Sequence, residues 1–306
     1  MIDAVKNAAD ELGCRYTENT PLCSYTTFST GGKCPLMIEL NGAASASRLT
    51  RLMKEKSIPY YVIGKGSNLI ADDRDIDMIF LHTGKDMSDI TQDGNRLICG
   101  AGASLAAISA RARDLSLTGL EFAHGIPGNA GGAVFMNAGA YGGEIKDVIV
   151  CAEAVDREGN IITLSNAEMA LGYRHSIFKE NGFIITKAVF ELEKGVKEDI
   201  SAKMAELAAM RKEKQPLEFR SAGSTFKRPQ GAFAAALIEQ CGLKGYCVGD
   251  AQVSEKHSGF VINKGHASFE DIMAVIAHVR RVVEEQTGYI LECEPEIIST
   301  RSDREG

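Results

Sequence analysis

Short apolar runs alternate with segments of helical periodicity in the first part of this chain. The runs at 36–40, 60–63 and 78–81 are bounded by turn-forming or charged residues, and this pattern predicts buried strands. Residues 2–12 and 43–56 carry apolar side chains at helical spacing, so we expect a helix over each range. Strands and helices are therefore expected to alternate here.

The middle of the chain has a different pattern. A strand at 96–100 precedes a helix over 104–115, and another strand is expected at 183–193. Between them, the apolar runs at 148–156 and 161–164 flank the turn sequence REGN, which predicts a hairpin.

A segment rich in alanine, glutamate and lysine from Val196 to Lys214 predicts a connecting helix, which Pro216 ends. The change in composition near residue 214 marks the clearest domain boundary. After it, three shorter elements are expected: a helix at 231–241 and strands around 251–253 and 260–263. A long helix then begins at Ser268, which forms a capping box with Asp271. We expect Gly288 to end it.

The stretch from Gly119 to Gly143 holds eight glycines in twenty-five residues and one formally charged side chain, Glu121. Glycines at this density allow close backbone approach and positive φ angles, and Pro127 stiffens a turn among them. Backbone N–H groups freed by such turns, with a short helix starting in AVFMNA, form a natural cradle for a pyrophosphate. We therefore expect this stretch to wrap a large ligand.

A flexible surface loop is the alternative interpretation of this stretch. Loop tips are usually polar, and the stretch instead contains five large apolar residues that favour burial: Phe122, Ile126, Val134, Phe135 and Met136. The apolar content favours the ligand-binding interpretation.

Two other G-x-G sequences, GKGSNL at 64–69 and GAGASL at 100–105, follow predicted strands but lack the third glycine of a dinucleotide fingerprint. The first leads into a short strand and DDRD instead of a helix, which argues against a Rossmann domain. No Walker A sequence occurs, so nucleotide hydrolysis has no support. The GKGSN turn still presents backbone N–H groups and the Ser67 hydroxyl, which suit a phosphate.

Composition narrows the class of protein. At 306 residues, with 44% hydrophobic and 25% charged content, the chain suits a globular protein of two or three domains. The net charge of −7 argues against a broad nucleic-acid surface. The polar N-terminus and the lack of a long apolar run predict a cytoplasmic protein without membrane contact. The eight cysteines lack CxxC pairs and metal-ligand spacing, so we expect buried, reduced thiols and no metal site.

Several polar residues of the second half have ordinary structural explanations when each is taken alone. Arg174 would pair with a surface carboxylate, and Ser224 would serve a turn. Lys214 would suit the C-terminal dipole of a helix, and Glu294 would face solvent on a terminal strand. His257 has no second ligand at a metal-binding spacing.

Read together and in order, six segments closely resemble the UDP-N-acetylenolpyruvoylglucosamine reductase family, and the resemblance covers almost the whole chain. They are YTTFSTGG at 25–32, VIGKGSNLI at 62–70, GLEFAHGIPGNAGGAVFMNAGAYGGEI at 119–145, YRHSIFK at 173–179, GSTFKRP at 223–229 and LIEQCGLKG at 237–245. The glycine-rich architecture is shared with other FAD oxidoreductases of the vanillyl-alcohol-oxidase type, whereas YRHS and GSTFK favour the reductase.

The resemblance implies an α+β fold. Two subdomains of the vanillyl-alcohol-oxidase (PCMH) type would sandwich FAD, and a C-terminal α+β domain would bind the substrate. The implied domains are residues 1–84, 85–213 and 214–306. In an alternative division, the last strand of the chain belongs to the FAD-binding part.

In this family, FAD is bound without a covalent bond, chiefly by backbone-rich turns. The matching residues are Gly64, Lys65, Gly66, Ser67, Asn68, Gly125, Ile126, Pro127, Gly128, Asn129, Gly131 and Gly132. Asn129 stands where threonine or serine is more usual, so the resemblance supports the backbone cradle and leaves one side-chain contact open.

The family reduces UDP-N-acetylglucosamine enolpyruvate to UDP-N-acetylmuramate for peptidoglycan synthesis, using NADPH through the flavin. An enol ether is electron-rich, so the site must stabilise the charge that develops on the substrate as hydride arrives. By position, Arg174 pairs with the substrate carboxylate, a protonated Glu294 donates a hydrogen bond to the enolate oxygen, and Ser224 protonates the adjacent carbon. A gap in the alignment would transfer the role of the glutamate to Glu296.

The resemblance also implies substrate contacts. Lys214 matches a position that contacts the diphosphate, and Arg228 replaces an asparagine found in many relatives. Two features indicate the shorter form of the enzyme: the presence of Arg228, and the lack of a tyrosine-bearing insertion between residues 174 and 214. We expect a UDP-sugar and NADPH as partners, and a monomer or a weak oligomer.

Two other functions are compatible with parts of the pattern. A flavin oxidase or dehydrogenase of the same fold, acting on another alcohol or sugar, would need neither Ser224 nor a UDP pocket. A nucleotide-sugar sensor has no use for a proton donor, so Arg174, Ser224 and Glu294 together argue against it.

Overall fold

The computed structural model describes residues 2–299. Their contacts divide the chain into two compact units, each built from segments that are far apart in the sequence. The first unit comprises the chain up to Asn19, Pro35–Lys65 and Met78–Met210. The second comprises Thr20–Cys34, Gly66–Asp77 and the described chain from Arg211 onward.

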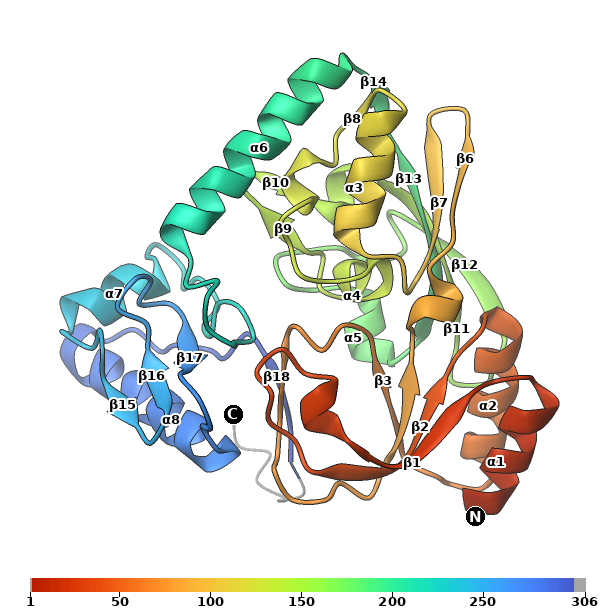
Figure 1. The fold of residues 1–306 in the computed structure, drawn as a ribbon, viewed down its shortest axis with the longest axis horizontal. Helices are drawn as coiled ribbons and strands as arrows, with labels where there is room; N and C mark the ends of the chain where they lie inside the picture. Colours follow the sequence, from red (N-terminus) through yellow and green to blue (C-terminus); the bar gives the residue numbers. More distant parts are fainter. Residues whose placement is uncertain (1, 300–306) are drawn as a thin grey trace. The chain divides into compact units, whose positions relative to one another are not determined.

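A four-stranded sheet, in the order β1-β2-β5-β3, forms one layer of the first unit (Figure 1). Its strands are β1 (Tyr16–Pro21), β2 (Lys33–Glu39), β3 (Tyr60–Ile63) and β5 (Ile79–His82), and its helices are α1 (Ile2–Glu11) and α2 (Ala43–Glu55). Strands β2, β5 and β3 run parallel, which requires crossover connections such as α2. Leu36 and Ile38 from the sheet and Leu49 and Met53 from α2 are buried in one core.

The second sheet of this unit is antiparallel and five-stranded, in the order β12-β11-β13-β7-β6. Its strands are β6 (Ile90–Asp93), β7 (Arg96–Gly100), β11 (Ile149–Val155), β12 (Ile161–Ser165) and β13 (Ile184–Glu191). The helices that accompany it are α3 (Leu105–Asp114), α4 (Ala130–Phe135) and α5 (Ile177–Asn181), and α6 (Lys197–Lys214) begins in this unit and ends in the second one. The short elements are η2 (Lys85–Met87), β8 (Leu117–Thr118), η3 (Glu121–Ala123), β9 (Gly139–Ala140), β10 (Gly143–Glu144), η4 (Ile145–Asp147) and β14 (Glu193–Lys194). Leu105, Ile108 and Val134 join this sheet in a single core.

In the second unit, a long helix, α8, packs against the small antiparallel sheet β15-β16-β17, and a shorter helix, α7, packs against α8 (Figure 1). Its elements are η1 (Leu22–Ser24), β4 (Leu69–Ala71), α7 (Ala234–Gln240), β15 (Cys247–Val248), β16 (Ala251–Val253), β17 (Val261–Asn263), α8 (Phe269–Thr287) and β18 (Glu296–Ile298). Strand β18 pairs in parallel with β4, so that Ile297 lies opposite Ile70. The end of the described chain is thereby joined to a segment from its first quarter.

Most predicted elements are confirmed. The strands at 60–63, 96–100 and 251–253 have the predicted bounds. Helix α8 has the predicted capping box, in which Ser268 Oγ accepts from Asp271 N at 3.1 Å and Asp271 Oδ2 accepts from Ser268 N at 3.0 Å. Gly288 ends it in the left-handed conformation, at φ 75°. Within residues 2–299, no helix is both long and apolar enough to cross a membrane.

Three expectations were wrong in detail. Helix α4 begins at Ala130, three residues before the expected AVFMNA segment, because Asn129 caps it. Helix α7 begins at Ala234 instead of 231, since Gly231 adopts a φ of 78° and Phe233 is the N-cap. The cysteines are all free, but Cys247 is exposed and four others are only partly buried.

Candidate active site

The glycine-rich stretch is a packed part of the first unit. Phe122 and Val134 are buried, and Ile126 and Phe135 pack against the same core. The surface-loop interpretation is therefore wrong. The side chain of Asn129, itself buried, ties the stretch together by donating to Thr83 O at 3.0 Å.

The N–H groups at the start of α4 are already used by the protein. Three bonds account for them: Ala130 N to Ala103 O at 2.8 Å, Gly131 N to Ala101 O at 2.9 Å, and Gly132 N to Asn129 Oδ1 at 3.3 Å. The expectation that these amides are freed for a phosphate was wrong. They instead hold the stretch against the turn between β7 and α3. A helix of six residues whose first amides are bonded in this way is an anchor for the stretch.

The segment before α4 is more open. Gly125 and Pro127 are exposed, and Gly128 O accepts from Leu105 N at 3.0 Å. Gly64 belongs to the same unit, and a Cβ atom placed on it would lie 2.6 Å from Asn129 Oδ1. The close approach of Gly64 to Asn129 brings the two glycine-bearing segments of this unit together and leaves no room for a side chain.

Arg174 lies at the tip of a two-residue turn in the first unit. Gly172 and His175 close the turn with two backbone hydrogen bonds, of 3.0 and 3.2 Å. Arg174 has a φ of 54°, which is uncommon for a residue with a side chain, and its guanidinium lies 5.2 Å from the Tyr173 ring centroid. After the turn, the buried Ser176 donates to Phe135 O at 2.6 Å, so the turn is tied to the end of α4.

In the second unit, backbone pairing brings Ser224 and Glu294 into the same short ladder. Glu294 N donates to Thr225 O at 2.9 Å, and Phe226 pairs with Cys293 in an antiparallel bridge. Thr225 is buried, and its hydroxyl accepts from a backbone N–H of β17, at Val261, at 2.9 Å. Sequence reasoning missed Thr225, although its position inside the GSTFK motif, next to Ser224, was an available signal.

The loop from Gly66 to Asn68 joins the same ladder. Asn68 Nδ2 donates to Glu294 O at 3.2 Å, and Glu296 N donates to Asn68 O at 2.9 Å. Gly66 has a φ of 60° and its carbonyl accepts from Thr27 N at 3.2 Å. Within residues 2–299, no protein acceptor receives the backbone N–H of Gly66 or Ser67. These two amides remain available to a phosphate-bearing ligand.

The three alternating glutamates of the C-terminal segment have different environments. Glu294 is only 9% exposed, so the ordinary explanation, in which it faces solvent, is wrong. Glu292 is exposed and forms an ion pair with Lys227 Nζ at 2.9 Å, and Glu296 is half-buried in β18. Cys293 lies between Glu292 and Glu294 in the chain. Burial raises the pKa of its thiol to about 11, so this neighbour of Glu294 stays uncharged at neutral pH.

The remaining candidates also belong to the second unit. Lys214 is exposed at the end of α6, and Arg228 is exposed with its guanidinium 4.7 Å from the Phe233 ring centroid. Phe233 is itself 61% exposed, which is unusual for a large apolar ring. Burial lowers the pKa of His257, and its Nδ1 accepts from Gly259 N at 3.2 Å. His257 therefore has a structural role as a neutral side chain.

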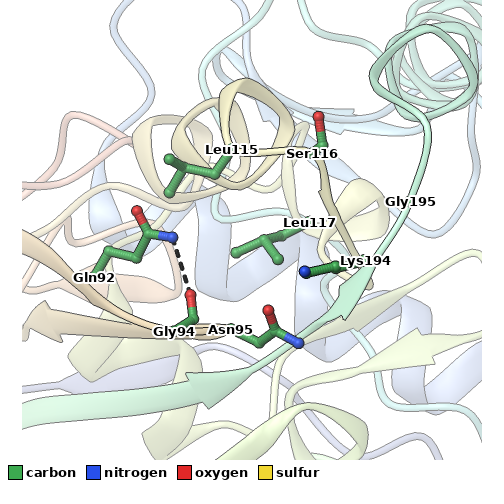
Figure 2. A pocket seen from close by; sticks show the side chains of 8 residues that line it. All are labelled: Gln92, Gly94, Asn95, Leu115, Ser116, Leu117, Lys194 and Gly195. Carbon is green, nitrogen blue, oxygen red and sulfur yellow. Dashed lines mark hydrogen bonds between the residues drawn. The ribbon is translucent and has the colours of Figure 1, made fainter.

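A hollow of about 430 Å³ lies elsewhere in the first unit (Figure 2). Its lining is Gln92, Gly94, Asn95, Leu115, Ser116, Leu117, Lys194 and Gly195. None of these residues was a candidate, and Lys194 is the one charged group among them. The hollow therefore has no group suited to acid–base chemistry near neutral pH.

The described geometry thus gathers the candidates into two sets. In the first unit, Gly64, the 125–132 segment and the Arg174 turn are connected through α4 and its cap. In the second unit, Asn68, Ser224 and Glu294 share one backbone ladder.

Two parts of the chain match known protein families. Residues 215–298 match the family described as UDP-N-acetylenolpyruvoylglucosamine reductase, C-terminal domain, and residues 36–165 match the family described as FAD binding domain. A reductase of that name from Clostridium novyi is 46% identical over 285 residues, which cover 93% of this chain and 92% of the relative. A second one, from Clostridium kluyveri, is 48% identical over 278 residues and 91% of each chain.

The chain belongs to the UDP-N-acetylenolpyruvoylglucosamine reductase family. The solved structure of such a reductase from Thermus caldophilus is 33% identical and aligns with a TM-score of 0.80, covering 94% of this chain and 100% of that one. The predicted fold class is therefore confirmed as an α+β FAD-binding fold followed by the C-terminal domain of this reductase family. Reductases of this family are FAD-dependent oxidoreductases, as the resemblance implied.

Proposed function

We propose that this chain reduces UDP-N-acetylglucosamine enolpyruvate to UDP-N-acetylmuramate, with NADPH as hydride donor, in the synthesis of peptidoglycan precursors. The observation that carries the proposal is the ladder of the second unit, in which Glu294 N bonds to Thr225 O, next to Ser224. An acid and a hydroxyl donor in two paired backbone segments suit a reaction that adds a hydride and a proton across a carbon–carbon double bond.

When bound, FAD would supply the hydride-transfer chemistry between NADPH and the enolpyruvyl group. We propose that twelve residues hold it: Gly64, Lys65, Gly66, Ser67, Asn68, Gly125, Ile126, Pro127, Gly128, Asn129, Gly131 and Gly132. The available N–H groups of Gly66 and Ser67 fit a diphosphate. The amides of Gly131 and Gly132 are already bonded, so these glycines would contribute close approach, as Gly64 does.

The chemical roles follow from residue type and environment. Arg174 would pair with the substrate carboxylate, because a guanidinium offers two parallel N–H donors to a carboxylate. Glu294, in its protonated form, would donate a hydrogen bond to the enolate oxygen, and its burial makes its interaction with a developing charge stronger than it would be in water. Ser224, half-buried at the start of the ladder, would protonate the adjacent carbon. Lys214 would bind the diphosphate of the substrate, and Arg228 would also contact the substrate.

We also propose the domain division at residues 84 and 213, a cytoplasmic location, and a monomer or weak oligomer. The assignment to the shorter form of the enzyme rests on Arg228 and on the lack of an insertion between residues 174 and 214.

The test is sugar-dependent NADPH oxidation by the FAD-loaded protein. Consumption of one NADPH per UDP-sugar, with a product two hydrogens heavier than the substrate, would support the proposal. The flavin oxidase alternative predicts NADPH-independent flavin reduction by another alcohol or sugar and reoxidation by oxygen. If NADPH oxidation requires oxygen and does not depend on the enolpyruvyl sugar, the proposed reaction is wrong.

A further inference from the structure

The two-residue turn that carries Arg174 is held by a buried amide from another segment. Asn137, which follows α4, is 1% exposed, and its Nδ2 donates to Gly172 O at 2.8 Å, at the base of the turn. The same nitrogen donates to Glu144 Oε2 at 3.0 Å, and Oδ1 accepts from Lys146 N at 2.9 Å. Asn137 therefore joins the Arg174 turn to the segment that contains β10.

Glu144 extends this link toward the guanidinium. Its carboxylate forms an ion pair with Lys146 Nζ at 2.8 Å. The pKa of Glu144 is lowered chiefly by the hydrogen bond from Lys146, then by that from Asn137, and the charge of Arg174 contributes in the same direction. Glu144 is thus a carboxylate close enough to Arg174 to interact with its charge.

The segment that carries these groups is itself shaped to bring them together. Strands β9 and β10 pair across the two-residue turn Tyr141-Gly142, whose φ angles are 52° and 92°. Asn137 has a φ of 43°. Non-glycine residues seldom adopt such angles, and positions where they do often serve a functional site.

We propose that Asn137 is a positioning residue for Arg174. Its amide fixes the base of the Arg174 turn and the Glu144 carboxylate relative to each other, so that the guanidinium is oriented toward the carboxylate of the substrate. This inference rests on the proposed function, in which Arg174 binds that carboxylate.

The alternative is that the amide only stabilises the fold. The two roles differ in what they predict for Arg174. A bidentate guanidinium–carboxylate pair depends on orientation, and a misplacement of about 1 Å can cost roughly 10²-fold in rate. Without the amide, the turn keeps its own two backbone bonds and the Ser176 anchor, so it should persist with a less defined orientation.

The experiment is a double-mutant cycle on the FAD-loaded enzyme, with Asn137→Ala and Arg174→Ala singly and combined. Asn137→Ala should slow reoxidation of the reduced flavin by the enolpyruvyl sugar about 10–100-fold and leave its reduction by NADPH within about twofold. In the Arg174→Ala background, Asn137→Ala should have no further effect. An equal loss in both backgrounds would overturn the proposal, as would unchanged reoxidation.

Asn166→Ala is the matched control. Asn166 also donates to two backbone carbonyls of the same unit, Lys146 O at 2.8 Å and Ile149 O at 2.7 Å, without bonding to the Arg174 turn. It should leave both half-reactions unchanged. If Asn137→Ala does not fold, Asn137→Asp replaces it in the cycle, since aspartate keeps an acceptor for Lys146 N but removes the donor to Gly172 O and Glu144.

A readout without turnover separates this inference from the proposed function. The Arg174 Nε–H signal in a nitrogen-15 NMR spectrum, identified by its loss in Arg174→Lys, should shift or broaden in Asn137→Ala and stay unchanged in Asn166→Ala. An unaltered signal in Asn137→Ala would overturn the positioning role. If the wild-type enzyme does not react with the sugar, the proposed reaction is wrong. The positioning role would still hold in that case if the Arg174 signal shifts in Asn137→Ala.

Discussion

Gly66 offers the sharpest test of how the loop at 66–68 is held. A Cβ atom on this residue would overlap the carbonyl oxygen of Tyr25 and lie 2.9 Å from its carbonyl carbon and 3.0 Å from Thr26 Cα. All three are backbone atoms, so no change of rotamer can relieve the collision. Gly66→Ala must therefore shift the backbone and weaken the bond from Thr27 N to Gly66 O.

Two costs contribute to the expected loss of stability. An alanine in the left-handed conformation costs about 1–2 kcal/mol. Forcing a methyl group into a filled space costs a further 1–3 kcal/mol or so. Gly94 has nearly the same φ, 57°, but open space around its Cβ position, so Gly94→Ala has only the first cost. The difference between the variants therefore isolates the collision.

Thermal unfolding of the FAD-free proteins measures this difference. At about 2–4 °C per kcal/mol, Gly66→Ala should unfold about 2–12 °C below Gly94→Ala. We also expect Gly66→Ala to retain less flavin per protein after gel filtration. Equal unfolding temperatures for the two variants would refute the close packing of Gly66 against the backbone at Tyr25.

Three further predictions concern the second unit. Ser224→Ala should slow reoxidation of reduced flavin by the sugar about 10²–10⁴-fold and leave bleaching by NADPH unchanged, as measured by stopped-flow absorbance. Glu294→Gln should lower the sugar-dependent rate about 10²–10³-fold while Glu296→Gln has little effect, and the reverse order would move the role to Glu296. The Arg74 hydrogen bond holds the pKa of the buried Asp72 carboxyl well below its ordinary value. Its stabilising contribution is complete above pH values of about 4 and is lost as the pH falls through the lowered pKa, so Asp72→Asn should flatten the acid decline of the unfolding free energy measured with urea.

Elements with local signals could be predicted from the sequence. The bounds of α8 follow from a capping box and a C-terminal glycine, which act within one or two turns of the helix. The strand at 60–63 follows from an apolar run between turn residues. In each case, the information lies in residues that are adjacent in the chain.

Features that depend on distant residues could not be predicted in this way. The parallel pair of β18 with β4 joins positions that no local pattern connects. The start of α4 depends on Asn129, whose side chain caps the helix and also reaches Thr83 O. A glycine-rich sequence of this kind is compatible both with a phosphate cradle and with an internal anchor. Only the structure shows that the first amides of α4 donate to protein acceptors.

The candidate site shows the same division. The resemblance implied roles for Ser224 and Glu294, which remain predictions. The burial of Glu294 contradicts the solvent exposure that its alternating pattern suggested. Asn137 was not singled out, although an asparagine between a short helix and a glycine is a known signal for a left-handed residue. Its partners, Gly172 and Glu144, come from two other segments, so its role depends on tertiary structure.

The central claim is that this chain transfers hydride from NADPH to an enolpyruvyl UDP-sugar through FAD. The most direct measurement is the visible spectrum of the FAD-loaded protein under anaerobic conditions, with NADPH added first and UDP-N-acetylglucosamine enolpyruvate second. We predict bleaching of the flavin by NADPH and full recovery of the oxidised spectrum after the sugar is added. A flavin that is bleached by NADPH and recovers only when oxygen is admitted would contradict the account.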